Sequence, residues 1–367
     1  MRASIALVAV GVACARPPAE PAPIALPDSG KTYFPADAWR TLPPRGAGVD
    51  EHLLSTLSDD MRRGKYGSLH GVVIVRYGFV VFEQYIGWTR DQPHTMQSVT
   101  KSVTSLLFGI ANKQQPVALA LDRPVLDVFT RYSSIANIDD NKRALTLRNL
   151  LTMRTSMDFY EQPYPGSPLD QLNRSSDDWV KFILDRRMLA PPGGEWAYNS
   201  GAAILTCGVV REVTNESVDA FAARELFEPI GIRSATWFKS PFDGLPHCGG
   251  GLGLRAVDLA RIGYLVLRRG QWGDTQIVPS EWVDASTRVD SHGPSLIFSS
   301  FSSSYGYFWW LFPHQRNGPD AEVITASGSG GQWLFVVPSL DLVVAVIAAD
   351  GDGLDLFYDG VLPAITN

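Results

Sequence analysis

The sequence contains little of what metal sites and nucleic-acid surfaces need. Among its 367 residues are three cysteines and six histidines, and the histidines are scattered, so neither a zinc site nor a Ser-His-Asp triad is indicated. The formal net charge is -6 and no long run of lysine and arginine occurs, which argues against a nucleic-acid partner. The stretch GLGLRA (251–256) matches a dinucleotide fingerprint, but it follows LPHCGG instead of a strand pattern. We therefore expect no cofactor and no metal.

Long apolar runs are also missing from most of the chain. Residues 3–13 (ASIALVAVGVA) are apolar or small, but these eleven residues are about half of the roughly 20 that a membrane span needs. They follow Arg2 and precede the small residues around Cys14, so residues 1–15 are expected to be a signal peptide. Cys14 resembles the lipid-modified cysteine of a bacterial lipoprotein, although Gly11 replaces the usual leucine-like residue. The sequence predicts a secreted or periplasmic protein, either cleaved or anchored to the membrane through Cys14.

Proline and alanine are abundant in residues 16–48 and predict an extended tether, which places a single folded domain at 49–367. Within that domain, β-rich segments at 71–87 and between 304 and 350 enclose helical patterns and proline-rich loops from about 115 to 255. This order predicts an α/β fold of the α+β type. Its antiparallel sheet is built from both chain ends, is flanked by helices and carries an inserted helical subdomain. Cys207 and Cys248, the two other thiols, could pair or remain separate.

Ser98 and Lys101 are the first candidates for chemistry. Apolar residues at helical spacing predict an amphipathic helix within residues 94–113, with Ser98 near its start. Lys101 falls on the same face, among small residues such as Ser102 and Gly109. A helix start favours a developing negative charge, and a lysine among small, dry neighbours has a lowered pKa. Ser98 could thus be a nucleophile with Lys101 as its base. The alternative is an ordinary helix with a surface lysine.

Two later stretches could supply further catalytic groups. In PPGGEWAYNSG (191–201), the Tyr198 phenol could act as acid or base if a neighbouring cation lowered its pKa. An aromatic anchor under a loop is the alternative. In TASGSGGQW (325–333), backbone N–H groups beside glycines could bind an oxyanion, whereas a simple hairpin turn would need the same glycines.

Together the three stretches resemble the ordered motifs of the penicillin-recognising serine hydrolases, which include serine β-lactamases, DD-peptidases and related esterases. The matching residues are Ser98-Val99-Thr100-Lys101, Tyr198-Asn199-Ser200 and Ala326-Ser327-Gly328-Ser329. The resemblance extends over roughly residues 49–360, and it is strongest to the 6-aminohexanoate-dimer hydrolase branch. It implies a β-lactamase/transpeptidase-like fold and a serine hydrolase that works through a Ser98 acyl-enzyme, which the expected signal peptide would make a secreted one.

The resemblance also implies roles for individual residues. Lys101 and Tyr198 are expected to share the proton transfers in an order left open, and the backbone N–H groups of Ser98 and Ser329 are expected to form the oxyanion hole. Ser200 is expected to bind the substrate or to orient Lys101. Further candidates for contact with the substrate are Asn199, Gly328, Gly330, Tyr160 and Asp170, together with Tyr164 and the aromatic run 305–310.

Two departures from the family pattern bear on the substrate. The third motif usually starts with a lysine or histidine, the lysine commonly holding a substrate carboxylate, whereas here it starts with Ala326. In the second motif, Tyr-x-Asn becomes Tyr-Asn-Ser. We therefore expect small amides or esters without a carboxylate at that position as substrates. A β-lactamase or DD-peptidase is the alternative enzyme, and a non-catalytic protein that binds cell-wall fragments is the alternative outside the enzymes.

Overall fold

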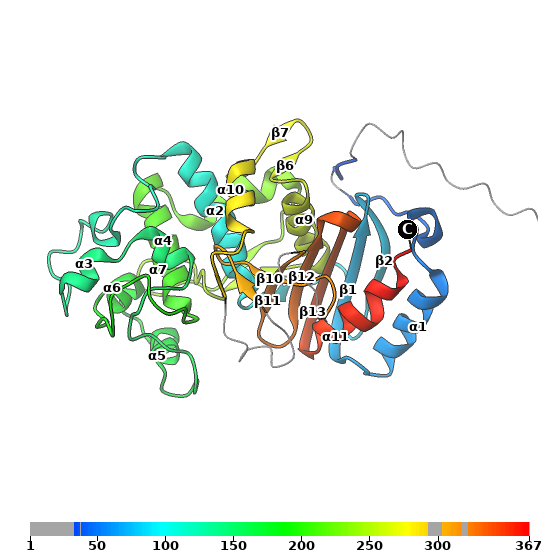
Figure 1. Cartoon of the computed structure of the whole chain (residues 1–367), viewed down its shortest axis with the longest axis horizontal. Coiled ribbons are helices and arrows are strands. Elements are labelled where there is room, and N and C mark those ends of the chain that lie inside the picture. Colours follow the sequence, from blue (N-terminus) through cyan, green and yellow to red (C-terminus); the bar gives the residue numbers. More distant parts are fainter. Residues whose placement is uncertain (1–32, 37, 293–302, 317–321, 367) are drawn as a thin grey trace, which may run out of the picture.

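The computed structural model describes residues 33–36, 38–292, 303–316 and 322–366. The expected signal peptide, Cys14 and residues 16–32 of the expected tether lie outside these residues. Figure 1 shows an antiparallel sheet on one side and a group of helices on the other. No helix in the described ranges is both long and apolar enough to cross a membrane.

Strands from both chain ends form the large sheet, as predicted. Its eight strands run in the order β2-β1-β13-β12-β11-β10-β9-β8. Strand β1 pairs antiparallel with β13, which places Val73 opposite Ala345 and joins the N-terminal hairpin to the C-terminal one. The strands are β1 (Gly67–Arg76), β2 (Phe79–Tyr85), β8 (Ser291–His292), β9 (Ser304–Tyr305), β10 (Trp310–Phe312), β11 (Val323–Gly328), β12 (Gln332–Val337) and β13 (Leu342–Gly351).

Helices cover both faces of this sheet. Neighbouring residues of a strand point to opposite faces, and Leu334 and Phe335 in β12 show what covers each. Leu334 faces α9 (Ala256–Leu267) so closely that a Cβ on Gly263 would lie 2.7 Å from its Cδ1. The Phe335 ring stacks on Phe357 of the C-terminal segment η6 (Leu356–Val361), with 4.2 Å between the ring centres. The continuous burial of β12 follows from this double cover.

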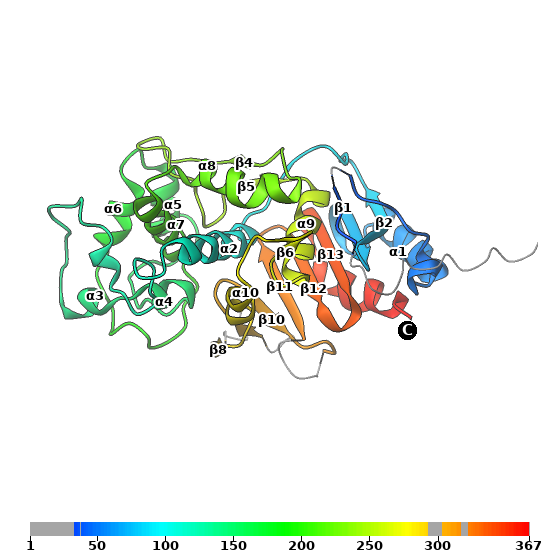
Figure 2. The same cartoon turned by 90° about the horizontal axis from the view of Figure 1, so that it is seen from above.

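The middle of the chain forms the expected helical subdomain. Five of its helices lie together on the far side of α2 (Val99–Gln114), so that α2 stands between them and the sheet (Figure 2). They are α3 (Asp140–Ala144), α4 (Leu147–Leu151), α5 (Pro168–Arg174), α6 (Trp179–Leu184) and α7 (Ser200–Thr214), whereas α8 (Val218–Ala222) lies alongside α2.

Shorter elements complete the described fold. Outside the subdomain are helices α1 (Glu51–Arg62), α10 (Ser280–Ser286) and α11 (Gly353–Asp355). Small strands are β3 (His94–Thr95), β4 (Thr236–Trp237), β5 (Leu252–Leu254), β6 (Gln271–Trp272) and β7 (Thr275–Gln276). Short helical turns are η1 (Pro44–Ala47), η2 (Val125–Asp127), η3 (Ala223–Phe227), η4 (Glu228–Ile230), η5 (Pro338–Leu340) and η7 (Leu362–Ala364).

The structure corrects the end of the expected tether. Residues 38–48 pack on the domain instead of continuing as an extended linker, and Trp39 is 8% exposed. The Trp39 indole donates to the carbonyl of Val257 at 3.1 Å, and the Tyr33 carbonyl accepts from the Tyr264 hydroxyl at 2.6 Å. Aromatic side chains among the prolines therefore dock this segment on α9, which a reading by composition overlooks.

Candidate functional site

Ser98 lies at the start of α2, next to a constrained piece of backbone. Gln97 just before it has a φ of 47°, an unusual value for a residue that is not glycine. The preceding strand β3 pairs with β5, and the N–H of Met96 donates to the carbonyl of Leu252 at 2.8 Å. The chain is thus anchored immediately before the turn, so the position of the Ser98 hydroxyl is set by backbone contacts.

Lys101 lies on the next turn of α2 and is 1% exposed. Its Nζ is 2.9 Å from Ser98 Oγ and donates to the carbonyl of Gly249 at 2.6 Å. Burial lowers the pKa of the amine to about 8, and the charge of Glu161 opposes this shift. An amine with this pKa is unprotonated in roughly one molecule in ten at pH 7. Lys101 can therefore accept a proton from the hydroxyl beside it.

The rest of the small-residue stripe on α2 serves packing. Ser102 donates to the carbonyl of Phe308 at 2.6 Å, and a Cβ on Gly109 would lie 2.2 Å from Trp282 of α10. The Trp282 indole in turn donates to the carbonyl of Ser105. Of the hydroxyls in this stripe, only that of Ser98 contacts the Lys101 amine within the described residues.

Tyr198 completes the group around the amine. Its ring centre lies 4.6 Å from Lys101 Nζ, and the ring stacks on Trp310 at 6.0 Å. Burial raises the pKa of the Tyr198 phenol, the negative charge of Glu161 raises it further, and an interaction with Ser98 lowers it by less. The condition named for a phenol that acts as a base, a lowered pKa, is therefore not met, because desolvation outweighs the stabilisation of a phenolate by neighbouring groups. Tyr198 is protonated at neutral pH and can donate a hydrogen bond.

The edge of β11 approaches Ser98 from the other side. A Cβ on Gly328 would lie 2.5 Å from the carbonyl oxygen of Met96, so only a glycine permits this approach. Among the described residues, the backbone N–H groups of Ser98 and Ser329 have no hydrogen-bond partner. Ser98 and Ser329 line the same cavities, and free N–H groups there are suited to an oxyanion.

Two cavities meet at Ser98, with volumes of about 590 Å³ and about 770 Å³. The residues that line both are Ser98, Glu161, Gln162 and Ser329. The smaller cavity continues along polar side chains and backbone groups, among them those of Thr95, Ser200, His247 and Gly249. The larger one continues along aromatic side chains, among them Phe159, Tyr160, Tyr198, Trp310 and Trp333. A substrate could thus place a group on each side of the hydroxyl.

Several of the residues predicted to contact the substrate line the two cavities. Tyr160, Trp310, Gly328 and Gly330 line the larger cavity, whereas Tyr164 and Ser200 line the smaller one. The other members of the aromatic run are core residues, since Tyr305, Tyr307, Phe308 and Trp309 are 0–3% exposed.

Asn199 and Asp170 are corrections, because both side chains have structural partners. Asn199 caps α7: its Oδ1 accepts from the N–H of Ala202 at 3.1 Å, and its Nδ2 donates to Thr155 at 3.2 Å. Asp170 accepts from the N–H of Gly166 at 2.9 Å and from Arg174 at 2.7 Å. Neither residue lines the two cavities. Asparagine and aspartate favour helix starts, so their residue types alone do not indicate a substrate contact.

The structure adds two groups that the motifs do not reveal. Glu161 lines both cavities, and its Oε1 accepts from the N–H of Ser200 at 2.5 Å. Gly249 supplies the carbonyl that holds Lys101, a role expected for Ser200. An acidic residue inside the aromatic stretch DFYEQPY and three successive glycines at 249–251 are the signals that could have pointed to them.

Known proteins resemble this chain in sequence and in fold. The family model described as Beta-lactamase matches residues 59–359. The 6-aminohexanoate-dimer hydrolase of Paenarthrobacter ureafaciens is 24% identical over 315 residues, which cover 81% of this chain and 76% of the relative.

Solved structures show the same fold at lower identity. A hydrolase with promiscuous acyltransferase activity superposes with a TM-score of 0.67 at 18% identity, covering 84% of this chain and 96% of that one. A family VIII carboxylesterase has a TM-score of 0.65 at 15% identity, covering 86% of this chain and 94% of that one.

Proposed function

The chain belongs to the beta-lactamase family of hydrolases, and from this premise we propose that it is a serine hydrolase of small neutral esters or amides. The observation that carries the proposal is the 2.9 Å contact between Lys101 Nζ and Ser98 Oγ, at a place where burial lowers the pKa of the amine to about 8. Ser98 attacks the substrate carbonyl, and the resulting acyl-enzyme is hydrolysed by water.

The pKa values of Lys101 and Tyr198 shift in opposite directions, which assigns a different proton-transfer role to each residue. Lys101 takes the Ser98 proton as general base, because its pKa is lowered toward neutrality. Tyr198 keeps its proton, because burial raises its pKa, and donates a hydrogen bond toward the leaving group. The leaving group then receives the proton that Lys101 accepted. The free backbone N–H groups of Ser98 and Ser329 stabilise the oxyanion.

The charge of the cavities supports a substrate without a carboxylate. Among the described residues, no lysine or arginine lines either cavity, whereas Glu161, Asp158 and Asp350 do. Ala326, at the place of the usual cation, is 0% exposed. Arg255, the basic residue that follows the glycine-rich segment 249–253, is engaged by Asp258, with contacts of 2.7 and 2.8 Å. Among the described residues that line the cavities, a substrate carboxylate would therefore meet acidic side chains and no basic one.

Steady-state kinetics on matched substrates test this proposal. We expect kcat/KM for neutral nitrophenyl esters to exceed that for cephalosporins at least tenfold, since a lost charge-assisted hydrogen bond is worth about 1.5–3 kcal/mol. A short linear amide belongs in the panel because a relative is a 6-aminohexanoate-dimer hydrolase. Ser98→Ala is the control and should lose all turnover. Equal or faster hydrolysis of cephalosporins would favour a β-lactamase, and failure of a fluorophosphonate to label Ser98 would favour a binding protein.

We also propose export from the cytoplasm. The pattern of residues 1–15 and the disulfide between Cys207 and Cys248 support it, because disulfides persist in oxidising compartments. Mass spectrometry of the mature protein should find either a start at Arg16 or a diacylglyceryl group on Cys14. An intact Met1 in the cytoplasmic fraction would contradict export.

A further inference from the structure

The carbonyl of Gly249 decides where the catalytic amine points. Among the described residues, Lys101 Nζ has two hydrogen-bond partners, Ser98 Oγ and this carbonyl. Gly249 is pressed against Ser200, since a Cβ on it would lie 2.9 Å from Ser200 Cβ. A shift of Gly249 would therefore change the direction of the amine relative to Ser98.

Gly249 belongs to a loop that helix α7 holds at two points. The loop runs from residue 238 to residue 251, between β4 and β5. Cys248 forms a disulfide with Cys207 of α7, and Asp243 accepts from Arg211 of α7 at 2.6 Å. Cys207 and Arg211 are four residues apart and lie on the same face of the helix. The two contacts therefore act as neighbouring anchors on one surface.

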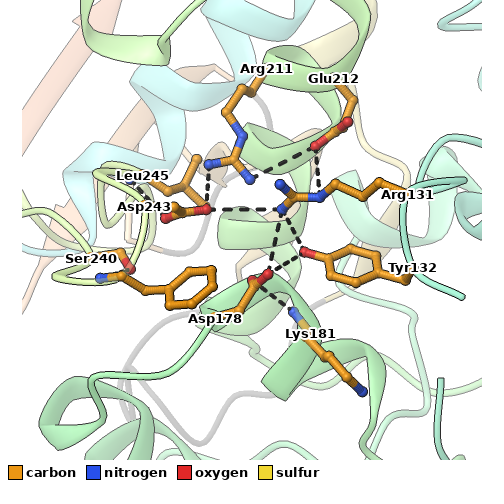
Figure 3. A network of polar contacts seen from close by, with 10 residues as sticks. Arg131, Tyr132, Asp178, Lys181, Arg211, Glu212, Ser240, Asp243 and Leu245 are labelled. Atoms are coloured by element: carbon orange, nitrogen blue, oxygen red, sulfur yellow. Dashed lines mark hydrogen bonds and ion pairs between the residues drawn. The ribbon is translucent and has the colours of Figure 1, made fainter. Parts of the chain in front are cut away.

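A wider network of charges supports the second anchor. Figure 3 shows Arg211 and Asp243 beside Arg131, Glu212 and the α6 cap Asp178. Arg131 Nε lies 3.2 Å from Glu212, and the distances from its Nη2 to Asp178 and Asp243 are 3.6 and 3.9 Å. The loop is thereby tied to α6 as well as to α7.

Helix α2 holds the same loop directly. The Thr104 hydroxyl donates to the carbonyl of Cys248 at 3.1 Å, one turn after Lys101. Both cysteines are 0% exposed, so the disulfide lies in the packed layer between α2 and α7. The covalent bond ends one residue before the carbonyl that contacts the amine.

From these contacts we propose that the Cys207–Cys248 disulfide and the Arg211–Asp243 ion pair are a positioning device, which fixes the Gly249 carbonyl so that Lys101 faces Ser98. The proposal rests on the proposed serine hydrolase function. A disulfide that served stability alone would not need to end beside the catalytic amine.

Release of the loop has a measurable chemical consequence. The ionisable groups around the amine are Tyr198, Glu161 and His247, which lies in this loop. Burial and the proximity of Lys101 lower the pKa of His247 to about 4, so it is neutral at pH 7. If the loop loosens, water reaches the Lys101 amine, and the pKa of that amine rises because burial is its largest perturbation.

The experiment compares three variants by the pH profile of kcat/KM for a neutral nitrophenyl ester. For the double variant Cys207→Ala/Cys248→Ala, we expect the acid limb to move to higher pH by about one unit, with about a tenfold lower rate at pH 7. Arg211→Gln should move the limb in the same direction by less. Arg224→Gln is the matched control, because its ion pair with Glu216 lies on the exposed surface of the subdomain, and its limb should stay in place.

A second readout separates this proposal from the proposed function. NMR titration of the Lys101 amine in a Ser98→Ala background reports its pKa without turnover, and we expect an upward shift in both loop variants, the smaller one in Arg211→Gln. Lower melting temperatures with an unchanged amine pKa and an unchanged limb would overturn the positioning role. If the double variant does not fold, Arg211→Gln decides the question alone. A wild-type enzyme without hydrolytic activity would refute the function, whereas the titration would still decide the effect of the loop on the amine.

Discussion

Lys101 beside the cavities and Lys142 in the helical subdomain are both 1% exposed, yet their surroundings differ in kind. The Lys142 amine donates to two backbone carbonyls, those of Ala136 at 2.7 Å and Leu184 at 2.8 Å. The Lys101 amine contacts one carbonyl and one hydroxyl, and lies over a phenol ring. Carbonyls only accept hydrogen bonds, so they favour an amine that keeps all its protons. A hydroxyl can also give up a proton.

Nearby carboxylates add to the difference between the surroundings of Lys101 and those of Lys142. Burial lowers the pKa of both amines, but Asp185 and Asp139 oppose this at Lys142, whereas Glu161 alone does so at Lys101. Burial by itself therefore does not make a lysine a base. The amine also needs a hydroxyl within reach and few negative charges around it.

The largest expected effect is the loss of activity when Lys101 is replaced, which tests its role as the base. Lys101→Met should lower kcat/KM at least about 10³-fold. A general base typically contributes 10²–10⁴-fold to the rate, and the Ser98 hydroxyl also loses the amine that contacts it. Lys142→Met is the matched control and should keep kcat/KM within about twofold. Ester kinetics at pH 8 measure both. Similar losses in the two variants would remove the distinction between the lysines.

The same substitution should also reveal the cost of the buried amine. The folded-state pKa of Lys101, about 8, lies below the ordinary 10.5, so the unfolded chain binds the proton more tightly. The wild-type free energy of unfolding should therefore rise from pH 8 to pH 10.5, by an amount on the order of 3 kcal/mol from this group. Lys101→Met should lack this component of the rise. Urea unfolding at pH 7 and pH 10 tests it, with Lys142→Met for comparison.

The next prediction asks whether Lys101 and Tyr198 act as one unit. Tyr198→Phe should lower kcat/KM about 10²-fold, and Lys101→Met with Tyr198→Phe should be little worse than Lys101→Met alone, because both serve the same proton path. Single-turnover rates with an activated ester, measured for the wild type, both single variants and the double variant, complete this double-mutant cycle. Losses that multiply fully would indicate two independent roles.

Lys142→Met should show a smaller effect, on stability alone. The carbonyls of Ala136 and Leu184 would lose their donor, and a buried acceptor without a partner costs about 1–3 kcal/mol. We expect a lower free energy of unfolding at pH 7 with unchanged kinetics. Unchanged stability would mean that relief from burying the amine offsets the lost hydrogen bonds.

The sequence could predict the residues whose side-chain chemistry defines the site. Ser98, Lys101 and Tyr198 have distinctive side chains at recognisable spacings, and the β-rich chain ends predict the shared sheet. The Gly249 carbonyl could not be predicted, because every residue has a carbonyl and only the folded loop brings this one to Lys101. The direction of the Tyr198 pKa shift could not be predicted, because it depends on burial by distant segments. The pairing of Cys207 with Cys248 was left open for the same reason, since it requires α7 and the loop to meet.

The smallest expected effect concerns Glu161, whose carboxylate is the charge that acts on the pKa of Lys101. Glu161 raises the pKa of Lys101 against the larger effect of burial, so its loss should lower that pKa further. Glu161→Gln keeps an oxygen that can accept from the N–H of Ser200 and removes only the charge. The acid limb of kcat/KM should therefore move to lower pH, by up to about one unit, with a gain in rate at pH 6 of no more than about tenfold.

Asp158→Asn is the matched control for this last prediction. Asp158 also lines the larger cavity, but its carboxylate is paired with Arg187 at 2.8 Å, and its charge is not among the causes of the Lys101 shift. Its substitution should leave the limb in place. The pH profiles of the two variants on one neutral ester make the comparison. A limb that moves to higher pH in Glu161→Gln would show that the carboxylate keeps Lys101 unprotonated through the structure of the cavity, and the assignment of its effect to charge would then be wrong.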